Sequence, residues 1–555
     1  MNEDAKSQEY TSIFGYFDED YYLHHNPDVA QAGANPLRHF MESGWREGRN
    51  PSAHFSVAYY LKIYPDVLAS GMNPLLHYAL AGRAEGRRAR RAMDAERTVV
   101  EEAQSPLPWL AGAQDCGQKR PVFSQWSMLE LLRSALNDKL SLVLSFSHDD
   151  YNSNLGGVQN LIREERREFE SMSFCYLHLF PAVSNVYLQE ERESNAIYNF
   201  TLEGGYGASV SASDLEAALL SLHRENLRIF TIIHHLMRNS PESVARICSI
   251  DPDRVIVWVH DFFTVCPNPN LLRNDIRFCG GPRVESAACN VCVYGKDRAA
   301  LRERVKSFFK AIVPWVLAPS ESALRHWLET SDLPCRGADV QSLARLALDG
   351  GSATWSTDPS RRIRIAHAGA RTPAKGWLTF QSLVDRFRQD DRYEFHQLGV
   401  MGGRSVPGVS HWPVRVTPEA PEAMVEALVE KQVDVVVSWS PWPETFCYAA
   451  YEAIAAGTFV LTHQGAGNVT AIISSQVPEQ GLVLPDEAAL FSLLEQGLGD
   501  VLRGRRRRRG TLIREGGTAA WLTRTAHGSK LLHEVFRSAR APAVELSNAS
   551  EGANV

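Results

Sequence analysis

The sequence lacks a long apolar segment, since no stretch approaches the ~18 consecutive apolar residues that a membrane-spanning helix needs. The opening segment, MNEDAKSQEY, is polar and acidic, so we expect no secretory signal peptide. Positive charge is not in excess, because 58 lysines and arginines stand against 65 aspartates and glutamates, a formal net charge of −7. That balance argues against nucleic acid as the main partner. We therefore expect a cytoplasmic protein.

Cysteine is scarce as well, with nine residues in a chain of 555. In a chain of this size that number is poor evidence for a disulfide framework, and thiols or a metal site are expected instead. The contents of hydrophobic residues (44%) and charged residues (22%) are close to those of soluble globular proteins, which excludes wholesale disorder and a fibrous chain. At roughly 100–200 residues per domain, the length predicts about three domains.

A repeat with an offset of 38 residues fills residues 1–90. Residues 17–29 read FDEDYYLHHNPDV, residues 55–67 read FSVAYYLKIYPDV, and the same offset carries Gly44 onto Gly82. Each copy is typical of two short helices joined by a turn that contains Asn-Pro. Two such units can bury their aromatic faces against each other, which favours a small helical scaffold. Docking to another protein or to a glycan is the alternative.

The rest of the chain divides into a linker, two α/β halves and a tail. Residues 91–139 read as a linker, and from residue 140 strand and helix patterns alternate, which is typical of βαβ units with parallel sheets. We expect two Rossmann-like halves that face each other across a cleft, residues 140–350 and 360–540, followed by a disordered tail, residues 541–555. Ligands bind outside the carboxyl ends of the strands in such sheets. The clearest strand patterns are residues 140–147, 174–179, 229–234, 255–260, 316–318, 362–367, 393–398, 433–438 and 458–462.

Two glutamates eight positions apart follow the strand pattern VDVVVS of the second half. Glu444 lies in the loop after that strand, and Glu452 lies on the helix that follows. Eight helical residues are a little over two turns, so both side chains can face one region at the ligand edge of the sheet. The plainer alternative is a charge at a helix N-terminus together with a solvated surface glutamate.

The run PWPETFCYAAYEAIAAGTFVLTHQGAGN resembles the E-x7-E region of family 4 retaining glycosyltransferases of bacterial polysaccharide biosynthesis. The N-terminal repeats also resemble tandem repeats that precede glycosyltransferase domains in bacterial polysaccharide clusters. The resemblance implies a GT-B fold of two Rossmann-like domains and a nucleotide-sugar donor. It further implies that Glu444 contacts hydroxyls of the donor sugar and that Glu452 contacts the ribose hydroxyls. An ionised carboxylate is a strong acceptor for such hydrogen bonds.

The segment AGARTPAKGW, after the strand RIRIAH, is similar to the G-R-x-x-P-x-K-G loop of the same family. The resemblance implies that the cations of this loop hold the diphosphate of the donor. Lys375 matches the family's lysine, whereas Ala370 stands at the family's arginine position and Arg371 lies one residue later. A solvated surface lysine is the plainer alternative for Lys375.

Glycine-rich turns follow strands in both halves. Gly467 and Asn468 open a helix after the strand TFVLT, and such a turn can offer backbone N–H groups to a phosphate. Gly156 and Gly157 resemble the family's glycine loop after its first strand, where small residues let a donor phosphate or an acceptor approach the backbone. A plain loop is the alternative there. His260 ends the strand VIVWVH and resembles the family's histidine beside the donor sugar.

Four cysteines follow that histidine within 27 positions and have the spacing C-x12-C-x9-C-x2-C. Four thiolates suit a closed tetrahedral site for structural zinc. Free structural thiols and redox chemistry are the alternatives. No catalytic metal is implied, because no D-x-D pair stands after a strand, and a lysine and backbone dipoles can meet the charge of the leaving diphosphate. The cysteines are Cys266, Cys279, Cys289 and Cys292.

An arginine-rich run, RGRRRRR, occupies residues 503–509. We interpret it as a solvated face, and the alternative is attraction to an anionic polymer or to lipid at the inner membrane face.

These features predict a retaining glycosyltransferase that moves a sugar from a nucleotide-sugar donor to a glycan or a lipid-linked glycan. Glu444 and His260 are the expected catalytic residues, and no catalytic cofactor is expected. The resemblance implies a front-face reaction in which the leaving phosphate helps to deprotonate the acceptor. The alternative is a non-catalytic scaffold protein that binds glycan or nucleotide sugar and docks polysaccharide assembly proteins through its repeats.

Overall fold

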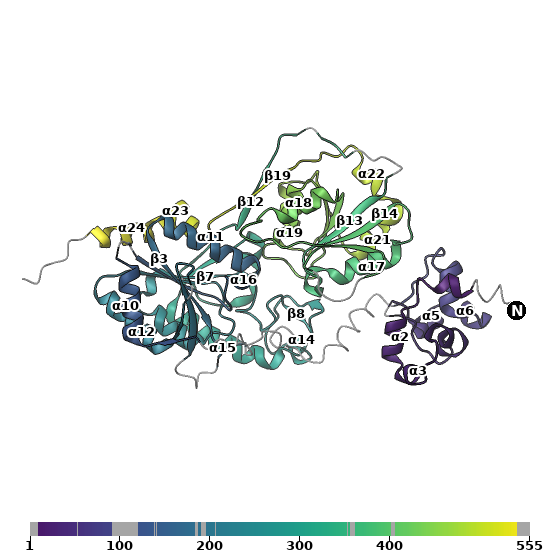
Figure 1. Ribbon diagram of the computed structural model, residues 1–555, viewed down its shortest axis with the longest axis horizontal. Coiled ribbons are helices and arrows are strands. Elements are labelled where there is room, and N and C mark those ends of the chain that lie inside the picture. The colour runs from purple at the N-terminus through teal and green to yellow at the C-terminus, as the bar shows by residue number, and fades with distance from the viewer. Residues whose placement is uncertain are drawn as a thin grey trace, which may run out of the picture. The chain divides into compact units, whose positions relative to one another are not determined.

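The computed structural model consists of two compact units, Met1–Ser105 and Pro106–Val555 (Figure 1). The expected tail, residues 541–555, and most of the expected linker lie outside the described residues. No helix among the described residues is both long and apolar enough to cross a membrane. The described residues are 9–52, 54–90, 120–137, 139, 141–183, 187–189, 196–205, 207–351, 353–355, 361–400 and 406–540.

The first unit is helical, and each copy of its sequence repeat has the same elements. Each copy forms three short α-helices and a short π-helix instead of the two helices expected. The proline of each PDV motif begins a helix of its own, because proline fits the first turn of a helix and disrupts its interior. The elements are α2 (Glu19–His25), α3 (Pro27–Gln31), α4 (Pro36–His39), η1 (Phe40–Gly44), α5 (Val57–Ile63), α6 (Pro65–Ser70), α7 (Pro74–His77) and η2 (Tyr78–Gly82).

A buried tyrosine, a histidine and a glycine define the centre of each copy. The hydroxyl of Tyr22 lies 2.9 Å from Nδ1 of His39. A Cβ atom at Gly44 would lie 2.0 Å from that hydroxyl, so only glycine leaves room for the pair. The second copy repeats this contact with the residues 38 positions later.

The first α/β half contains a nine-stranded sheet in the order β1-β5-β4-β3-β2-β6-β7-β10-β11. Its neighbouring strands are parallel except that β4 is antiparallel to both β3 and β5. Every residue of β2 and β3 is buried, as expected of parallel strands covered on both faces. The strands are β1 (Val122–Phe123), β2 (Ser141–Phe146), β3 (Phe174–Pro181), β4 (Ile197–Leu202), β5 (Ser209–Ser211), β6 (Ile229–Ile233), β7 (Val255–Trp258), β10 (Trp315–Ala318) and β11 (Gly337–Val340).

One helix of this half, α10 (Gln125–Ala135), lies within residues 91–139, which the sequence analysis assigned to the linker. The linker therefore ends earlier than residue 139, because the apolar face of this helix, with Met128, Leu129 and Leu132, is buried in the core of the first half. The longer helices are α10 (Gln125–Ala135), α11 (Gly157–Ser171), α12 (Ala212–Arg224), α13 (Pro241–Cys248), α15 (Gly295–Ile312) and α16 (Glu321–Ser331); a short helix is α14 (Ala287–Asn290), and a small ribbon is formed by β8 (Leu272–Arg273) and β9 (Arg277–Phe278).

The second half contains a parallel six-stranded sheet in the order β15-β14-β13-β16-β17-β18. Numbered along the chain this order is 3-2-1-4-5-6, that of a Rossmann sheet, and its direction reverses between β13 and β16. The elements are β13 (Ile363–Ala368), β14 (Tyr393–Gly399), β15 (Val409–Pro413), β16 (Val435–Val437), β17 (Phe459–His463), β18 (Gly481–Leu484), α17 (Trp377–Phe387), α18 (Ala423–Glu430), α19 (Tyr448–Ala455), α20 (Asn468–Ser475), α21 (Glu487–Gln496) and α22 (Leu498–Leu502).

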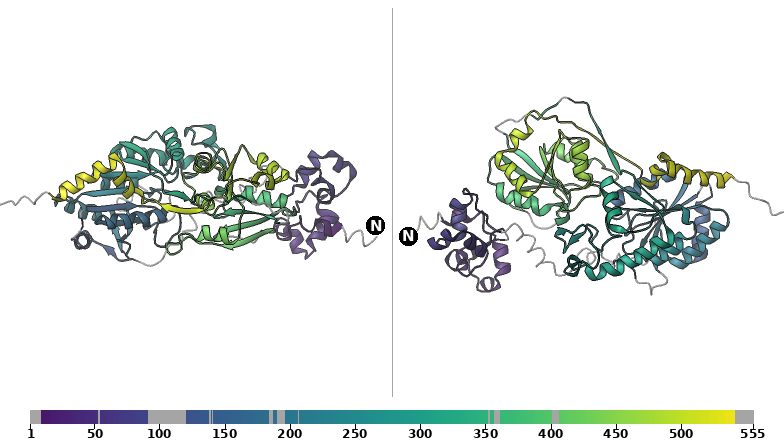
Figure 2. Two further views of the ribbon diagram at one scale, coloured as in Figure 1. Left: turned by 90° about the horizontal axis from the view of Figure 1, so that it is seen from above. Right: turned by 180° about the vertical axis from the view of Figure 1, so that it is seen from behind.

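The chain passes twice between the two halves. The passages contain β12 (Ala344–Leu348) and β19 (Gly510–Arg514), which pair as antiparallel strands. After β19 the chain forms α23 (Gly517–Arg524) and α24 (Ala526–Arg540), which lie beside α11 and β3 of the first half (Figures 1 and 2). The second half therefore ends near residue 514 instead of 540, because the apolar side chains of α23 and α24 are buried in the core of the first half.

The arginine-rich run belongs to the second passage and is solvated only in part. Arg505, Arg507 and Arg508 are half-buried and donate hydrogen bonds to backbone carbonyls, for example from Nε of Arg507 to the oxygen of Gly457 at 2.9 Å. The bonds of Arg505 and Arg507 attach the passage to the second half. The bond of Arg508 joins it to Asp349 in the first passage. The expected fold class, two Rossmann-like α/β halves preceded by a small helical region, is confirmed.

Candidate active site

Glu444 and Lys375 meet at the carboxyl edge of the second sheet. Lys375 ends the 3-10 turn η4 (Pro373–Lys375) after β13, and Glu444 follows the neighbouring strand β16. Nζ of Lys375 lies 2.8 and 2.9 Å from the two carboxylate oxygens of Glu444. The side chain of Glu444 is 2% exposed and that of Lys375 is 42% exposed. Burial alone would lower the pKa of Lys375, but Glu444 outweighs that effect and the pKa is raised, so the lysine keeps its charge.

The loops that carry these two residues are bonded to each other. The carbonyl oxygen of Ala374 accepts hydrogen bonds from Oγ of Ser440 at 2.7 Å and from Nε1 of Trp442 at 3.0 Å. The next turn requires glycine, because Gly376 has φ of +78° and a Cβ atom there would lie 2.2 Å from the carbonyl oxygen of Trp439. The lysine loop is thus held against the loop of Glu444.

Gly467 and Asn468 position Glu444 through its backbone. Gly467 forms a parallel bridge with Glu444, and the N–H of Asn468 donates to the carbonyl oxygen of Glu444 at 2.9 Å. Gly467 has φ of +62°, and a Cβ atom there would lie 2.7 Å from that oxygen. The N–H of Asn468, expected to be offered to a phosphate, is therefore already used within the protein.

Glu452 lies on α19 and is 4% exposed. Its carboxylate makes no hydrogen bond or ion pair with any residue that the structure describes. Burial raises its pKa to about 7, with Glu422 adding to the rise and Arg514 opposing it. A buried carboxyl group without partners is unfavourable in the protein alone, and such groups are common where a ligand supplies the missing donors.

Arg371 stays at the same edge as Lys375. Its guanidinium lies over the ring of Trp377, 5.4 Å from the ring centroid. Burial, with smaller contributions from Lys375 and Arg371, lowers the pKa of His367 to about 4. The imidazole of His367 is therefore neutral, and its Nε2 lies 3.1 Å from the carbonyl oxygen of Ala370.

The backbone of His260 is bonded to the residue next to Glu444. The hydroxyl of Thr445 donates to the carbonyl oxygen of His260, and the carbonyl oxygen of Thr445 accepts from Oγ of Ser320 at 2.8 Å. The expected catalytic residues of the two halves are therefore brought together at the carboxyl ends of both sheets. Burial lowers the pKa of His260 well below its usual range, so the ring is neutral.

The glycine loop of the first half faces the helix that carries Glu452. A Cβ atom at Gly157 would lie 3.4 Å from the ring of Tyr448, the first residue of α19. A Cβ atom at Gly156 would lie 2.3 Å from Oε1 of Gln159. Gly157 thus allows the loop to approach α19 of the second half closely. Gly156 allows the side chain of Gln159 to approach the backbone of the loop.

Sequence reasoning identified His260 at this edge but missed the other histidines that lie near it. Polar pairs follow three buried strands, and this pattern could have identified them, because the carboxyl ends of parallel strands lie along one edge. Nε2 of His235 lies 3.0 Å from Oδ2 of Asp261, and the ring of His148 contacts that of His235. The pairs are His148-Asp149 after β2, His234-His235 after β6, and His260-Asp261 after β7.

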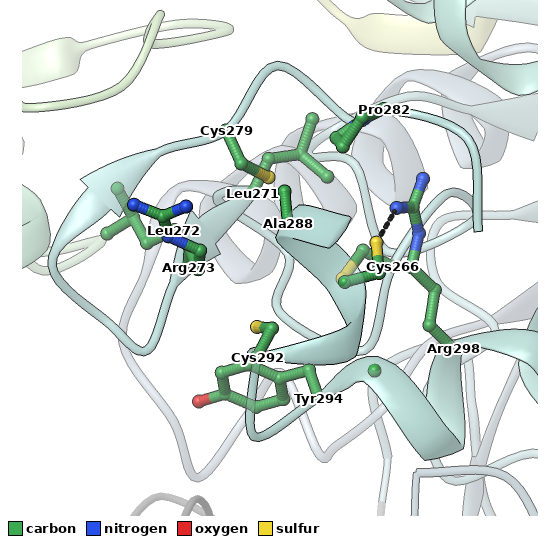
Figure 3. A pocket seen from close by; sticks show the side chains of 12 residues that line it. Cys266, Leu271, Leu272, Arg273, Cys279, Pro282, Ala288, Cys292, Tyr294 and Arg298 are labelled. Carbon is green, nitrogen blue, oxygen red and sulfur yellow. Dashed lines mark hydrogen bonds between the residues drawn. The ribbon is translucent and has the colours of Figure 1, made fainter. Parts of the chain in front are cut away.

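The four cysteines line one pocket (Figure 3). Nη1 of Arg298 lies 2.8 Å from Sγ of Cys289, and burial raises the pKa of Cys266 to about 12, so that thiol is neutral. Among the residues that the structure describes, no three His, Cys, Asp or Glu side chains are placed to hold one metal ion. Zinc binding by Cys266, Cys279, Cys289 and Cys292 stays a prediction.

No family model and no curated protein matches the chain. Among solved structures, a sucrose-phosphate synthase from Thermosynechococcus elongatus is 13% identical, with a TM-score of 0.42 over 72% of this chain and 96% of that one. The catalytic domain of starch synthase IV from Arabidopsis thaliana, bound to ADP and acarbose, is 12% identical, with a TM-score of 0.39 over 73% and 100%. HepE from Anabaena, in complex with UDP-glucose, is 12% identical, with a TM-score of 0.35 over 65% and 90%.

Proposed function

We propose that the protein is a retaining glycosyltransferase that moves a sugar from a nucleotide-sugar donor to a glycan or lipid-linked glycan in bacterial polysaccharide biosynthesis. One observation carries the proposal. The Lys375–Glu444 ion pair lies at the switch point of the second sheet, and the next residue, Thr445, is bonded to the backbone of His260 in the first half. A lysine, a carboxylate and a neutral histidine at one edge suit a donor that has a diphosphate and a sugar.

Lys375 is the residue that would hold the diphosphate. Its ammonium group has three N–H donors, and the two contacts with Glu444 leave one for a phosphate oxygen. Glu444 thereby orients the ammonium group of Lys375. Its carboxylate oxygens would also accept hydrogen bonds from hydroxyls of the donor sugar. In the front-face reaction, the leaving phosphate takes the proton of the acceptor hydroxyl. The rate then depends on the positions of the reactants and on charges fixed in advance.

Glu452 is the residue that would bind the ribose. The donor's hydroxyl groups would supply the hydrogen bonds that its carboxylate lacks within the described protein. Binding of these hydroxyls also favours the ionised form, which burial disfavours. Nucleotide binding should therefore lower the pKa of Glu452 from about 7.

A panel of nucleotide sugars, screened by the change in melting temperature and then by transfer, tests the proposed function. Glu452→Gln should weaken nucleotide binding by about 1.5–3 kcal/mol, the loss of a hydrogen bond to a charged group. Glu430→Gln is the matched control, because Glu430 ends α18 in the same half and its side chain is 72% exposed. Binding at the unmodified strength after Glu452→Gln would contradict the assignment of this residue.

One observation favours a second function, a scaffold that binds nucleotide sugar without transferring it. Ala370 stands where the resembling family has an arginine, so one cation for the leaving diphosphate is missing from its expected place. Slow hydrolysis of the donor without an acceptor would favour the transferase. Tight donor binding without hydrolysis or transfer would favour the scaffold.

We also propose that the four cysteines bind one structural zinc ion. The proposal rests on their common pocket and on their spacing within 27 positions. Because the described side chains are not grouped around one ion, binding would have to draw the four thiols together, release their protons and replace the contact between Arg298 and Cys289. Metal analysis of protein purified without chelators should find about one zinc per chain, and Cys289→Ser should lower that content. Zinc far below one per chain, with four titratable thiols, would leave free structural thiols.

A further inference from the structure

A buried carboxylate lies behind the candidate active site of the first half. Glu165 lies on α11, and its side chain is 0% exposed. It accepts hydrogen bonds from Nε2 of His234 at 3.1 Å, from the hydroxyl of Tyr176 at 3.0 Å and from the N–H of Thr518 at 2.8 Å. Burial alone would raise the pKa of Glu165, but His234 and Thr518 outweigh burial and lower it. Glu165 is therefore an ionised carboxylate with three donors.

His234 connects this carboxylate to His260. Nδ1 of His234 lies 3.1 Å from Nε2 of His260. The ring of His260 stacks on Trp258, with centroids 5.0 Å apart and planes 4° apart. The indole of Trp258 donates to Oγ1 of Thr518 at 2.9 Å, so the same residue fixes Trp258 and caps Glu165. The His260 ring is held by a hydrogen bond at one edge and by a stacked ring on its face.

The hydrogen bonds determine which nitrogen carries each proton. An ionised carboxylate only accepts, so Nε2 of His234 carries a proton; where that is the ring's one proton, Nδ1 is an acceptor. Nε2 of His260 must then be the donor to that atom. Since neutral imidazole has one ring proton, Nδ1 of His260 retains its lone pair. That atom makes no hydrogen bond with any residue in the described part of the chain.

We propose that Glu165 and His234 are positioning residues that fix the tautomer of His260, so that its Nδ1 accepts a hydrogen bond from a sugar hydroxyl. An unprotonated phosphate oxygen only accepts and would be repelled by this lone pair. The site therefore distinguishes the sugar from the diphosphate, which Lys375 would hold. The identity of the ligand rests on the proposed function, whereas the tautomer does not.

Burial is the main reason that the ring of His260 is neutral, and the histidines around it, His234 first among them, act in the same direction. His148 follows β2 and His235 follows β6, the strand between β2 and β7 in the sheet. Each opposes a positive charge on His260. Asp261, the carboxylate next in sequence, is hydrogen-bonded to His235 at 3.0 Å. Only protonation of His234 would reverse the arrangement, because His234 would then donate from both nitrogens and His260 would expose an N–H.

Nitrogen NMR of the full chain with labelled histidines, at pH 8 and without ligand, tests the tautomer. His260→Gln assigns the signal, and we expect Nε2 of His260 to be protonated and Nδ1 to be unprotonated. Glu165→Gln, which keeps the shape of the side chain, should raise the fraction protonated at Nδ1 about fivefold, the equivalent of one ordinary hydrogen bond. His234→Phe should do the same. His223→Gln is the matched control, because that ring bonds only to the carbonyl oxygen of Leu227 within the described residues.

A protonated Nδ1 in the unmodified protein, or an unchanged signal in Glu165→Gln with its fold intact, would overturn the proposal. Titration with glucose, which offers hydroxyl donors and has no charge, should shift the Nδ1 signal more than inorganic phosphate does. The reverse order, or no response to either probe, would overturn the hydroxyl assignment. A correct tautomer in a protein that transfers no sugar would contradict the proposed function and leave the positioning role standing.

Discussion

Two buried glutamates, one in each half, have opposite electrostatic environments. Glu165 in the first half is enclosed by three hydrogen-bond donors, and its pKa is lowered. Glu452 in the second half has no hydrogen-bond partner among the described residues, and its pKa is raised to about 7. Burial is nearly the same, at 0% and 4% exposure, so the donors account for the difference. The carboxylate with partners is part of the protein's framework, and the one without them is available to a ligand.

The two residues should therefore affect stability in opposite directions as the pH changes. The stabilisation from Glu165 is present above its unfolded pKa and is lost as the pH falls through its lowered folded pKa. Glu452 has a folded pKa above its unfolded one. Its ionisation therefore destabilises the fold progressively as the pH rises from about 4.5 through about 7.

The largest expected effect comes from removing the framework carboxylate. Glu165→Ala leaves His234, Tyr176 and Thr518 without their acceptor, and we expect the free energy of unfolding to fall by about 3–5 kcal/mol. Urea unfolding followed by tryptophan fluorescence measures the change. Glu130→Ala on α10 of the same half is the control, because that glutamate is exposed. Equal stabilities for the two variants would mean that the three hydrogen bonds contribute nothing.

The next largest expected effect is a rise in the free energy of unfolding instead of a fall. Glu452→Gln removes a buried charge that Arg514 compensates only in part, so at pH 9 we expect the ligand-free protein to be more stable by up to about 3 kcal/mol. At pH 5 the folded protein has this carboxyl group protonated, and the variant should differ little. Melting curves at the two pH values give the comparison. If the variant and the unmodified protein differ in stability by the same amount at both pH values, the pKa of Glu452 is not raised in the folded protein.

The effect expected at Glu444 is intermediate in size. Its side chain is buried, but its ion-pair partner Lys375 is also exposed to solvent. Glu444→Gln keeps an acceptor for Lys375 and loses the charge, so the free energy of unfolding should change by only about 0.5–1.5 kcal/mol. Under the proposed function, kcat should fall while KM for the donor changes little. Transfer assays alongside melting curves separate these quantities. A rise in KM without a fall in kcat would assign Glu444 to ground-state binding.

The smallest effect is expected from deletion of residues 1–90. The helical region belongs to a separate compact unit, so the unfolding free energy of the two α/β halves should change by less than about 0.5 kcal/mol. Acceptor use or complex assembly should suffer instead. Calorimetry of the shortened protein, with Glu165→Ala in the same background, shows whether the first prediction holds without the repeats. Loss of folded protein on deletion would contradict the division into units.

Lys375 and Glu444 could each be predicted as site residues, because the family resemblance that carries them lies in short local segments, whereas their ion pair was not predicted. Each residue follows a strand of the same parallel sheet, and parallel strands place their carboxyl ends together. Glu165 could not be predicted, because it lies in the helical run REERREFE, whose charges suggest a solvated surface. Its environment depends on a segment more than 300 positions later, and no helical periodicity reports such a contact. For the same reason, the return of α23 and α24 to the first half was missed.

The bond between Thr518 and Glu165 joins residues 353 positions apart, and this separation has a consequence for synthesis. A ribosome that adds about 5–20 residues per second needs roughly 20–70 s to make the intervening chain. Throughout that interval the carboxylate of Glu165 lacks its bond to Thr518, and so does the indole of Trp258 once residue 258 has been made. The surroundings of His260 can therefore be completed only after residue 518 has been made, although most of the first half is made before the second.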